Sequence, residues 1–254
     1  LYSIIDNPFG KDEIFSSFIF SITRLIGCFI FAFFIIYFLV ILNFASKEKI
    51  SNSYLGPITN FLKRYGKFAF FILLLISLYR IADVVMGVMA NIFYLEKGYK
   101  ISEIATFSKF FGVFATIVGG FIGGYCSYKF GTMKALFFGA LIAALSNLLF
   151  AWLAVSPTSV NFLIAVITAD NISSGFAGAA FVIYLSGLTS IKFTATQYAL
   201  FSSIMLFLPK LIAGYAGSWV DIMGYAYFFS FTAFLGIPVL LLIIWIGKVA
   251  PIKH

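Results

Sequence analysis

Long apolar runs separated by short polar connectors make up most of the 254-residue chain. Crossing about 30 Å of hydrocarbon takes roughly 20 apolar residues in a helix, and seven runs approach or exceed that length. They cover Ser21–Asn43, Phe68–Phe93, Ile104–Tyr125, Met133–Val155, Phe162–Leu188, Ala195–Trp219 and Tyr225–Ile246. Strands of a membrane barrel would be shorter and would alternate apolar with polar residues, which these runs do not. The pattern predicts an all-α integral membrane protein with about seven transmembrane helices.

Composition and charge narrow the class further. Hydrophobic residues make up 62% of the chain and charged residues 10%, which is outside the range of soluble domains. The net charge of +8 would indicate nucleic acid in a soluble protein, but the basic residues gather in alternate connectors, so we expect the lipid bilayer, and no nucleic acid, as a partner. These basic residues are Lys47, Lys49, Lys63, Arg64, Lys67, Lys129, Lys134, Lys192, Lys248 and Lys253. By the positive-inside rule their connectors and the C-terminus are predicted to be cytoplasmic.

The other connectors carry little net basic charge and are predicted to lie outside. Two acidic and two basic side chains nearly cancel in the segment 96–103, and the segment 156–161 is uncharged. Seven spans then place the N-terminus outside. Because that arrangement is unusual and the chain begins with Leu1, we expect an N-terminal part to be missing.

Two connectors share a glycine pattern. The motif G-x-x-x-Y-x-x-G at 124–131 recurs as G-x-x-x-D-x-x-G at 217–224, and the predicted topology puts the first copy inside and the second outside. Transporter halves built from three-helix units related by inversion would carry matching turns on opposite faces. The first copy, with Lys129 before its last glycine, resembles the cytoplasmic turn of major facilitator transporters, although Tyr128 stands where that turn usually has an acidic residue.

Small residues spaced four apart precede the first of these turns. Gly119, Gly120, Gly123 and Gly124 would let two helix backbones approach closely. Packing is the first interpretation, and a latch that acts while a transporter rocks between its two open states is the second. The residues to which we assign packing and gating roles are Gly120, Gly124, Lys129, Gly131, Gly217, Asp221 and Gly224.

The longest polar stretch is the interval Ala45–Lys67, which mixes basic with apolar residues at helical spacing. It is predicted to be a cytoplasmic linker containing a surface helix. In a major facilitator such a linker separates two six-helix halves. The chain then divides into an N-terminal segment with one transmembrane helix (1–45), the linker (46–67) and a six-helix C-terminal transporter half (68–254).

Ionisable residues inside the apolar runs are the first candidates for a functional site, because charge in a membrane is costly. Arg80 and Asp83 lie three residues apart on one helical face, close enough to pair. Two interpretations stay open. The pair is either a structural element that positions its helix, or it keeps both groups charged until a substrate or a proton competes for one of them.

The fifth run contains a polar segment. Asp170 and Asn171 come just before the Ser-Ser-Gly sequence at 173–175, and that composition weakens a helix. An unwound binding segment near mid-membrane and a gently kinked helix with ordinary hydrogen bonds are both open.

Two lysines also lie inside apolar runs. Lys210 follows Pro209 near the middle of the sixth run, and Lys109 lies nearer the outer end of the third. Either could face an anionic substrate, and Lys210 is the better candidate because the long stem of Lys109 can carry its charge to the surface. Asn147 and Gln197 are further candidates, although such side chains often simply hold membrane helices together.

Enzyme chemistry has little support in the sequence. The only histidine, His254, is the last residue, and Cys28 and Cys126 both lie in apolar helix contexts typical of free thiols. We see no Ser/His or Cys/His arrangement, phosphate-binding loop or metal-ligand cluster. A catalytic carboxylate pair formed by Asp83 and Asp170 would lack characteristic flanking residues. We therefore expect no enzyme activity, no cofactor and no metal.

Five stretches resemble one family closely. They are LYRIADVV (78–85), SKFFGVFATIVGGFIGG (108–124), ALSNLLFAW (144–152), FTATQYALFSS (193–203) and GYAGSWVDIMGY (214–225). From about Phe68 to Ile246 the chain resembles the C-terminal half of AmpG-type muropeptide permeases, which are major facilitator proteins of the bacterial inner membrane. The same family includes acetyl-CoA transporters of eukaryotic membranes.

The resemblance implies import of anhydro-muropeptides, which are sugar and peptide fragments from cell-wall turnover, driven by the proton gradient. Arg80, Lys109 or Lys210 would then face acidic groups of the substrate, and Asp83 or Asp170 would carry the coupling proton if burial favours its protonated form. Acetyl-CoA or another anionic metabolite is the alternative substrate. The N-terminal helices of the family lie outside this sequence, so the rival interpretation is a non-transporting remnant or a split half that acts by associating with another membrane helix bundle.

Overall fold

The computed structural model describes residues 14–41 and 55–249. Residues 46–54 of the predicted linker lie outside the described residues, and so do three of the basic residues used to predict the topology, Lys47, Lys49 and Lys253. The chain forms two compact parts, Leu1–Lys63 and Arg64–His254. In the first part, helix α1 (Ile14–Ile41) exposes apolar side chains such as Phe15 and Phe33 all along its length. A helix that is apolar over most of its surface suits a lipid environment, although α1 also carries Arg24.

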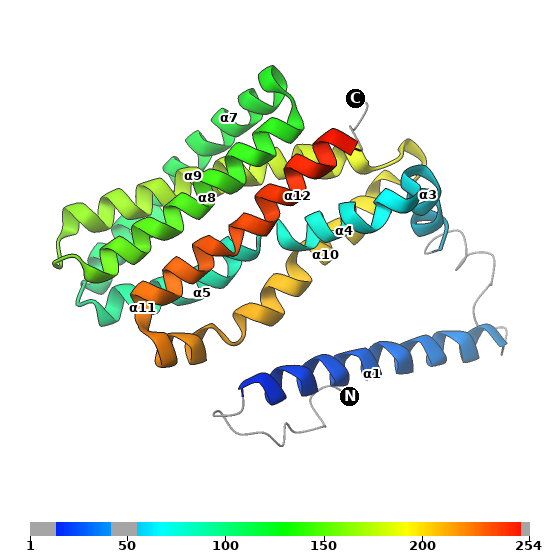
Figure 1. Cartoon of the computed structure of the whole chain (residues 1–254), viewed down its shortest axis with the longest axis horizontal. Coiled ribbons are helices and arrows are strands. Elements are labelled where there is room, and N and C mark those ends of the chain that lie inside the picture. The colour runs from blue at the N-terminus through cyan, green and yellow to red at the C-terminus, as the bar shows by residue number, and fades with distance from the viewer. Residues whose placement is uncertain (1–13, 42–54, 250–254) are drawn as a thin grey trace. The chain divides into compact units, whose positions relative to one another are not determined.

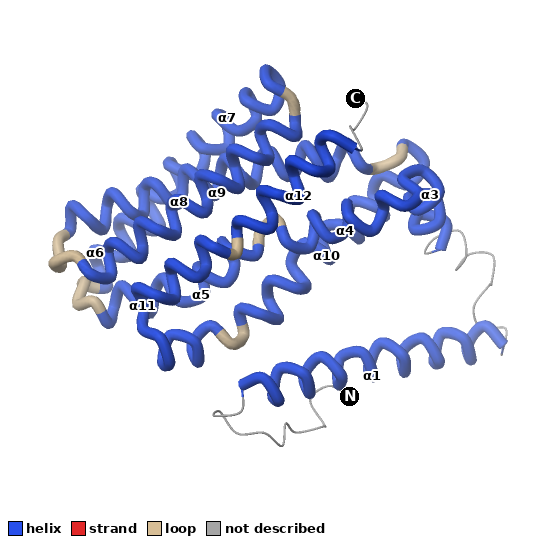
Figure 2. Tube along the Cα trace, viewed as in Figure 1, coloured by secondary structure: helices blue, strands red, loops and turns tan. Residues whose placement is uncertain are grey.

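Seven helical segments of the described chain are long and apolar enough to cross a membrane, and no strand occurs among the described residues (Figure 2). They span Phe15–Ile35, Gly56–Glu96, Ile101–Phe130, Thr132–Val155, Val160–Leu188, Ile191–Ala213 and Ala216–Val249. The predicted all-α membrane class and the predicted number of spans are confirmed. The second segment starts earlier than predicted because helix α3 (Gly56–Tyr65), which lies within the expected linker, runs directly into it.

The second part consists of helices joined by short turns (Figure 1). Its elements are the 3₁₀ turn η2 (Gly66–Phe68), α4 (Ala69–Leu78), α5 (Ile81–Glu96), α6 (Ile101–Ile104), the π-helical segment η3 (Ala105–Phe111), α7 (Gly112–Phe130), α8 (Thr132–Val155), α9 (Val160–Leu188), the 3₁₀ turn η4 (Ile191–Phe193), α10 (Thr194–Ala213), α11 (Ala216–Phe234) and α12 (Gly236–Val249). Helices α7 and α8 meet at Gly131, whose φ of 90° favours glycine.

Helix α9 packs against both α7 and α8 in the second part (Figure 1). A Cβ atom on Gly119 of α7 would lie 2.1 Å from the Ile172 carbonyl oxygen of α9, and one on Gly175 of α9 would lie 2.1 Å from the Thr116 carbonyl oxygen of α7. The two backbones are therefore so close that only glycine fits at these positions, as small residues permit in membrane bundles.

Aromatic side chains join the other helices. Phe229 of α11 packs against Phe93 of α5, with ring centroids 5.0 Å apart, and against Phe150 of α8, at 5.2 Å. Tyr94 of α5 stacks on Phe150 at 5.9 Å. Such ring pairs add directional contacts to the burial of apolar area, so α5, α8 and α11 form a second packed group.

Arg64 ties the start of the second part to the end of α9. Its guanidinium donates hydrogen bonds to the carbonyl oxygens of Leu188 and Thr189. These carbonyls belong to the last turn of a helix, where the backbone lacks internal donors and a cation is favourable.

The fifth span does not unwind. α9 is continuous from Val160 to Leu188, so of the two open interpretations the unwound binding segment is wrong and a helix with internal hydrogen bonds is what the structure has. Gly175 lets the backbone of α7 lie close to α9. The Ser173 hydroxyl lies 2.8 Å from the Asp170 carbonyl oxygen of the same helix. The small and polar residues that lower helix propensity thus serve packing, and tertiary contacts override the local preference.

Breaks occur elsewhere. The second span is interrupted at Tyr79 and Arg80, between α4 and α5. The sixth predicted run, Ala195–Trp219, was expected to be continuous but breaks at Gly214 and Tyr215, whereas Pro209 is accommodated inside α10. α11 bends at Gly224, whose φ is 75°.

Candidate functional site

The break between α4 and α5 places an ion pair inside the second part. Arg80 ends the break with φ −97° and ψ 9°, and Asp83 lies in the first turn of α5, where the helix dipole favours a negative charge. The Arg80 Nη2 atom lies 3.0 Å from the Asp83 Oδ2 atom, and the two side chains are 22% and 9% exposed. The predicted contact between these two side chains is therefore present, and it is largely withdrawn from the surface.

Helix α9 supplies the other side of this site. Arg80 donates from Nη2 to the Ser174 hydroxyl at 3.2 Å and from Nη1 to the Ser174 carbonyl oxygen at 3.4 Å. One turn further on, a Cβ atom on Gly178 would lie 3.6 Å from Nη1, which is an ordinary contact distance, so the guanidinium also lies beside this part of α9. Arg80 thus bridges the carboxylate of α5 and the polar segment of α9.

Asp170 completes the group. Its carboxyl interacts electrostatically with Arg80 and Asp83 and is in hydrogen-bonding contact with Ser146 of α8. The buried Ser173 hydroxyl lies 3.1 Å from the Ser146 hydroxyl. The interior polar cluster, as we name it, consists of Arg80, Asp83, Ser146, Asp170, Ser173 and Ser174.

The charges of this cluster do not balance if every group is ionised. One guanidinium faces two carboxyls, and Asp83 holds the short contact to it. An uncompensated charge in a low-dielectric interior is costly, and a bound proton removes that cost. The interior polar cluster therefore holds one more carboxyl than it has guanidinium groups to pair with.

The neighbouring amides Asn171 and Gln197 have structural partners. Asn171 accepts a hydrogen bond from Thr116 of α7 at 3.0 Å and donates to the Ile167 carbonyl at 2.8 Å. Gln197 is fully buried and accepts from the Ser190 backbone N–H at 2.7 Å, before α10 begins. Both side chains hold helices or turns in place.

Asn147 differs from these amides. It is fully buried in α8, and neither of its amide atoms has a hydrogen-bond partner among the described residues. Most buried polar side chains are satisfied, so Asn147 is an unusual feature of the bundle interior.

The two candidate lysines are exposed and lie away from the interior polar cluster. Lys109 is part of the π-helical segment η3. Lys210 lies on α10 beside a shallow hollow of about 360 Å³, which is lined by Ser203, Leu206, Phe207, Lys210 and Leu211. Its charge is therefore available to a neighbouring molecule.

Of the residues predicted to form turns, Gly131 separates α7 from α8, whereas Gly224 lies at the bend inside α11. Gly131 and Gly224 have positive φ values of 90° and 75°. Lys129 is exposed and lies over the rings of Tyr125 and Phe130, and Asp221 is exposed. A Cβ atom on Gly124 or Gly217 would meet nothing within 4 Å, and one on Gly120 would lie 3.9 Å from the Gly175 carbonyl oxygen. The closest contacts are made instead by Gly119 and Gly123.

The exposed faces of the helices differ in chemistry. α7 exposes Val113, Phe114, Ile117 and Phe121, which suit lipid tails. The outward positions of α10, three or four residues apart, are Thr196, Ala199, Ser203, Phe207 and Lys210. Small and hydroxyl residues are typical of contacts between membrane helices, and the charge of Lys210 is costly in lipid, so this side of the second part suits contact with protein or with a water-filled cavity.

Sequence reasoning missed the break at Tyr79 and Arg80 and the roles of Ser146 and Ser174. No glycine or proline marks the break. Tyr79 is buried, and its hydroxyl donates to the Leu136 carbonyl oxygen of α8 at 3.3 Å. The serines occur in a chain with many others, and only the packing of α8 and α9 distinguishes them.

Removing one member of the ion pair is expected to destabilise the protein more than removing both. Arg80→Met would leave Asp83 without its partner and should lower the free energy of unfolding by about 2 to 4 kcal/mol, toward the lower part of the range for buried pairs. The double variant Arg80→Met/Asp83→Asn should recover at least half of that loss. Thermal unfolding of the purified variants measures both, and a double variant no more stable than Arg80→Met would contradict the account.

These features define the class as a multi-pass helical membrane protein that encloses ionisable groups among its spans, an arrangement typical of transporters. The chain is 37% identical over 194 residues to transporter AmpG 4 of Rickettsia felis, 35% over 206 residues to AmpG 4 of Rickettsia conorii, and 36% over 189 residues to AmpG 1 of Rickettsia bellii. No protein-family model matches the chain.

The chain is therefore a relative of the AmpG transporters, which are named as transport proteins and not as enzymes. The matches cover 76%, 81% and 74% of this chain but 46%, 49% and 46% of the relatives. The chain thus spans about half the length of the curated relatives it matches.

Proposed function

We propose that the chain forms the C-terminal half of a proton-coupled transporter that imports anhydro-muropeptides across the bacterial inner membrane. The observation that carries this proposal is the interior polar cluster, in which Arg80 and Asp83 pair and Asp170 adds a second carboxyl. Intramembrane carboxyls are the usual carriers of protons in pumps and transporters.

A second helical half is the partner that this proposal requires. The chain spans about half of its relatives, and the charge of Lys210 on α10 is costly if it lies against lipid. Substrate sites of facilitators lie between two repeats, so we place the substrate path along α10, with the other half opposite. We further propose that the linker (46–67) and the C-terminus lie on the cytoplasmic side of the membrane, as the charge pattern predicts.

The substrate of this transporter is an anion. Lys210 is exposed beside the hollow on α10, and acidic peptide groups of a muropeptide would be suitable partners for its ammonium group. Acetyl-CoA or another anionic metabolite would meet the same charge. Muropeptides are preferred because the sequence resembles muropeptide permeases over most of the second part.

Lys210→Ala is expected to weaken substrate binding without changing stability. Loss of a hydrogen bond to a charged group costs about 1.5 to 3 kcal/mol, which raises the KM for uptake about tenfold or more. Lys134→Ala, on a predicted cytoplasmic connector, is the matched control and should leave KM unchanged. Initial uptake rates over a range of substrate concentrations measure both, and equal KM values for the two variants would remove Lys210 from the substrate path.

A second candidate function is a non-transporting remnant, or a split half that acts only by associating with another membrane helix bundle. Uptake of labelled anhydro-muropeptide in permease-deficient cells separates the two candidates. The chain would be expressed alone and together with the N-terminal half of an AmpG relative. Uptake only when both halves are present supports the proposed C-terminal transporter half. The absence of uptake in both cases favours the non-transporting candidate.

A further inference from the structure

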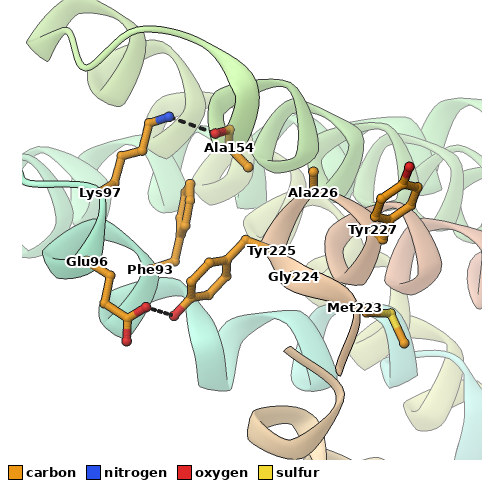
Figure 3. Close-up of a pocket in the computed structure, with 9 residues that line it drawn as sticks. All are labelled: Phe93, Glu96, Lys97, Ala154, Met223, Gly224, Tyr225, Ala226 and Tyr227. Atoms are coloured by element: carbon orange, nitrogen blue, oxygen red, sulfur yellow. Dashed lines mark hydrogen bonds between the residues drawn. The ribbon is translucent and has the colours of Figure 1, made fainter. Parts of the chain in front are cut away.

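A cavity of about 440 Å³ lies at the end of the second part where α5, α8 and α11 meet, away from the interior polar cluster. The residues that line this end cavity are Phe93, Glu96, Lys97, Ala154, Met223, Gly224, Tyr225, Ala226 and Tyr227 (Figure 3). Its volume is in the range of small-ligand sites. The charge pattern predicts that this end faces outward.

The cavity wall carries one acidic and one basic side chain, which point toward different partners (Figure 3). The Glu96 Oε2 atom accepts a hydrogen bond from the Tyr225 hydroxyl at 2.9 Å, and the Lys97 ammonium donates to the Ala154 carbonyl oxygen at 2.7 Å (Figure 3). Each contact uses only part of the group's capacity, because a carboxylate accepts at two oxygens and an ammonium donates three hydrogens. Both groups can therefore bind a ligand without giving up these contacts.

Hydrogen bonds between connectors hold this wall in place. The Thr158 hydroxyl donates to the Lys97 carbonyl oxygen at 3.1 Å, and the Tyr99 hydroxyl donates to the Ser159 carbonyl oxygen at 3.1 Å. Burial raises the pKa of the Tyr99 hydroxyl, so it remains a neutral donor. The cavity is thus preformed, which lowers the cost of binding.

The surroundings of the cavity are apolar and aromatic. Large, exposed side chains lie at the C-terminal ends of α5 and α8 and beside the bend of α11, namely Leu95, Trp152, Val155, Ile222 and Tyr227. Trp and Tyr gather where a membrane protein meets the lipid headgroups. A ligand held here would have charged groups near Glu96 and Lys97 and hydrocarbon along the outside of the helices.

We infer that the end cavity binds the headgroup of a phospholipid that carries both a primary ammonium and a phosphate, with the ammonium at Glu96 and the phosphate at Lys97. A carboxylate and an ammonium on the wall of one cavity match this pair of charges, whereas a purely anionic headgroup would be repelled by Glu96. A trimethylated ammonium could not donate a hydrogen bond to the carboxylate. The inference does not depend on the substrate that the protein transports.

Native mass spectrometry of the full chain tests the inference after purification from vesicles with equal amounts of phosphatidylethanolamine, phosphatidylcholine and phosphatidylglycerol. The wild-type protein should retain phosphatidylethanolamine in preference to the other two. Glu96→Gln and Lys97→Met should each lower this retention about tenfold or more, since each loses a charge-assisted contact. The matched controls Glu103→Gln and Lys100→Met, at the same end but outside the cavity, should retain the lipid as the wild type does.

Equal retention of the three lipids by the wild type, or a preference for phosphatidylglycerol, would overturn the inference. The wild-type comparison of the primary and trimethylated headgroups remains decisive if a variant does not fold. Displacement of the lipid by a soluble zwitterionic dipeptide would also contradict a lipid site, since it would assign the cavity to a transported peptide.

Discussion

Gly119→Ala is expected to lower the stability of the protein more than any other single methyl group that could be added to α7. The new Cβ atom would lie 2.1 Å from the Ile172 carbonyl oxygen and 2.9 Å from two other backbone atoms of that residue. Backbone atoms cannot move independently of α9, so the two helices must separate along part of their length. Overpacking of this kind costs about 1 to 3 kcal/mol and occasionally more.

The cost should exceed the gain in helix propensity from Gly to Ala, which is about 1 kcal/mol. The melting temperature of Gly119→Ala should therefore fall, by roughly 5 °C for a net loss of about 2 kcal/mol in a chain of this size. Gly175→Ala should behave alike, because its Cβ atom would approach the Thr116 carbonyl oxygen to 2.1 Å.

Gly124→Ala is the matched control for this prediction. It lies in the same helix, and an added Cβ atom there meets nothing within 4 Å. Its melting temperature should equal or slightly exceed that of the wild type. Thermal unfolding in one detergent measures all three variants, and a Gly119→Ala protein as stable as Gly124→Ala would disprove the close approach of α7 and α9.

Asp170→Asn is expected to abolish accumulation of substrate against its gradient while leaving the protein folded. The amide keeps the size of the carboxyl and its contact with Ser146, but it cannot release a proton. It also removes one of the two carboxyls that face the single guanidinium of Arg80. We expect the variant to be as stable as the wild type and still able to exchange labelled for unlabelled substrate.

Uphill uptake and equilibrium exchange, measured on the same membranes, separate these effects. Thr168→Ser is a suitable control because it changes a hydroxyl residue of α9 that bonds to the Ile164 carbonyl oxygen of its own helix and takes no part in the interior polar cluster. If Asp170→Asn accumulates substrate as the wild type does, Asp170 does not carry the coupling proton.

The sequence was sufficient to predict the membrane class and the number of spans, because both depend on the length of apolar runs. The same applies to the Arg80 and Asp83 contact, since side chains three apart on a helix are neighbours. These are local properties, and local properties can be read from the order of the residues.

The helix break at Arg80 and the continuity of α9 were not predictable in this way. The break lacks glycine and proline, and the Ser-Ser-Gly segment at 173–175 remains helical because α7 and α8 pack against it. The sequence also does not show which glycines of α7 contact α9. Gly119 and Gly120 are adjacent in the sequence, but they point to different sides of α7, and only the position of α9 decides between them.

Proton movement linked to substrate entry is the most direct test of the central claim. The chain would be paired with the N-terminal half of an AmpG relative in sealed vesicles that contain a pH-sensitive dye, and anhydro-muropeptide would be added outside. The account predicts that the interior becomes acidic as substrate enters and that Asp170→Asn removes this signal. Substrate entry without acidification would contradict proton coupling through the interior polar cluster.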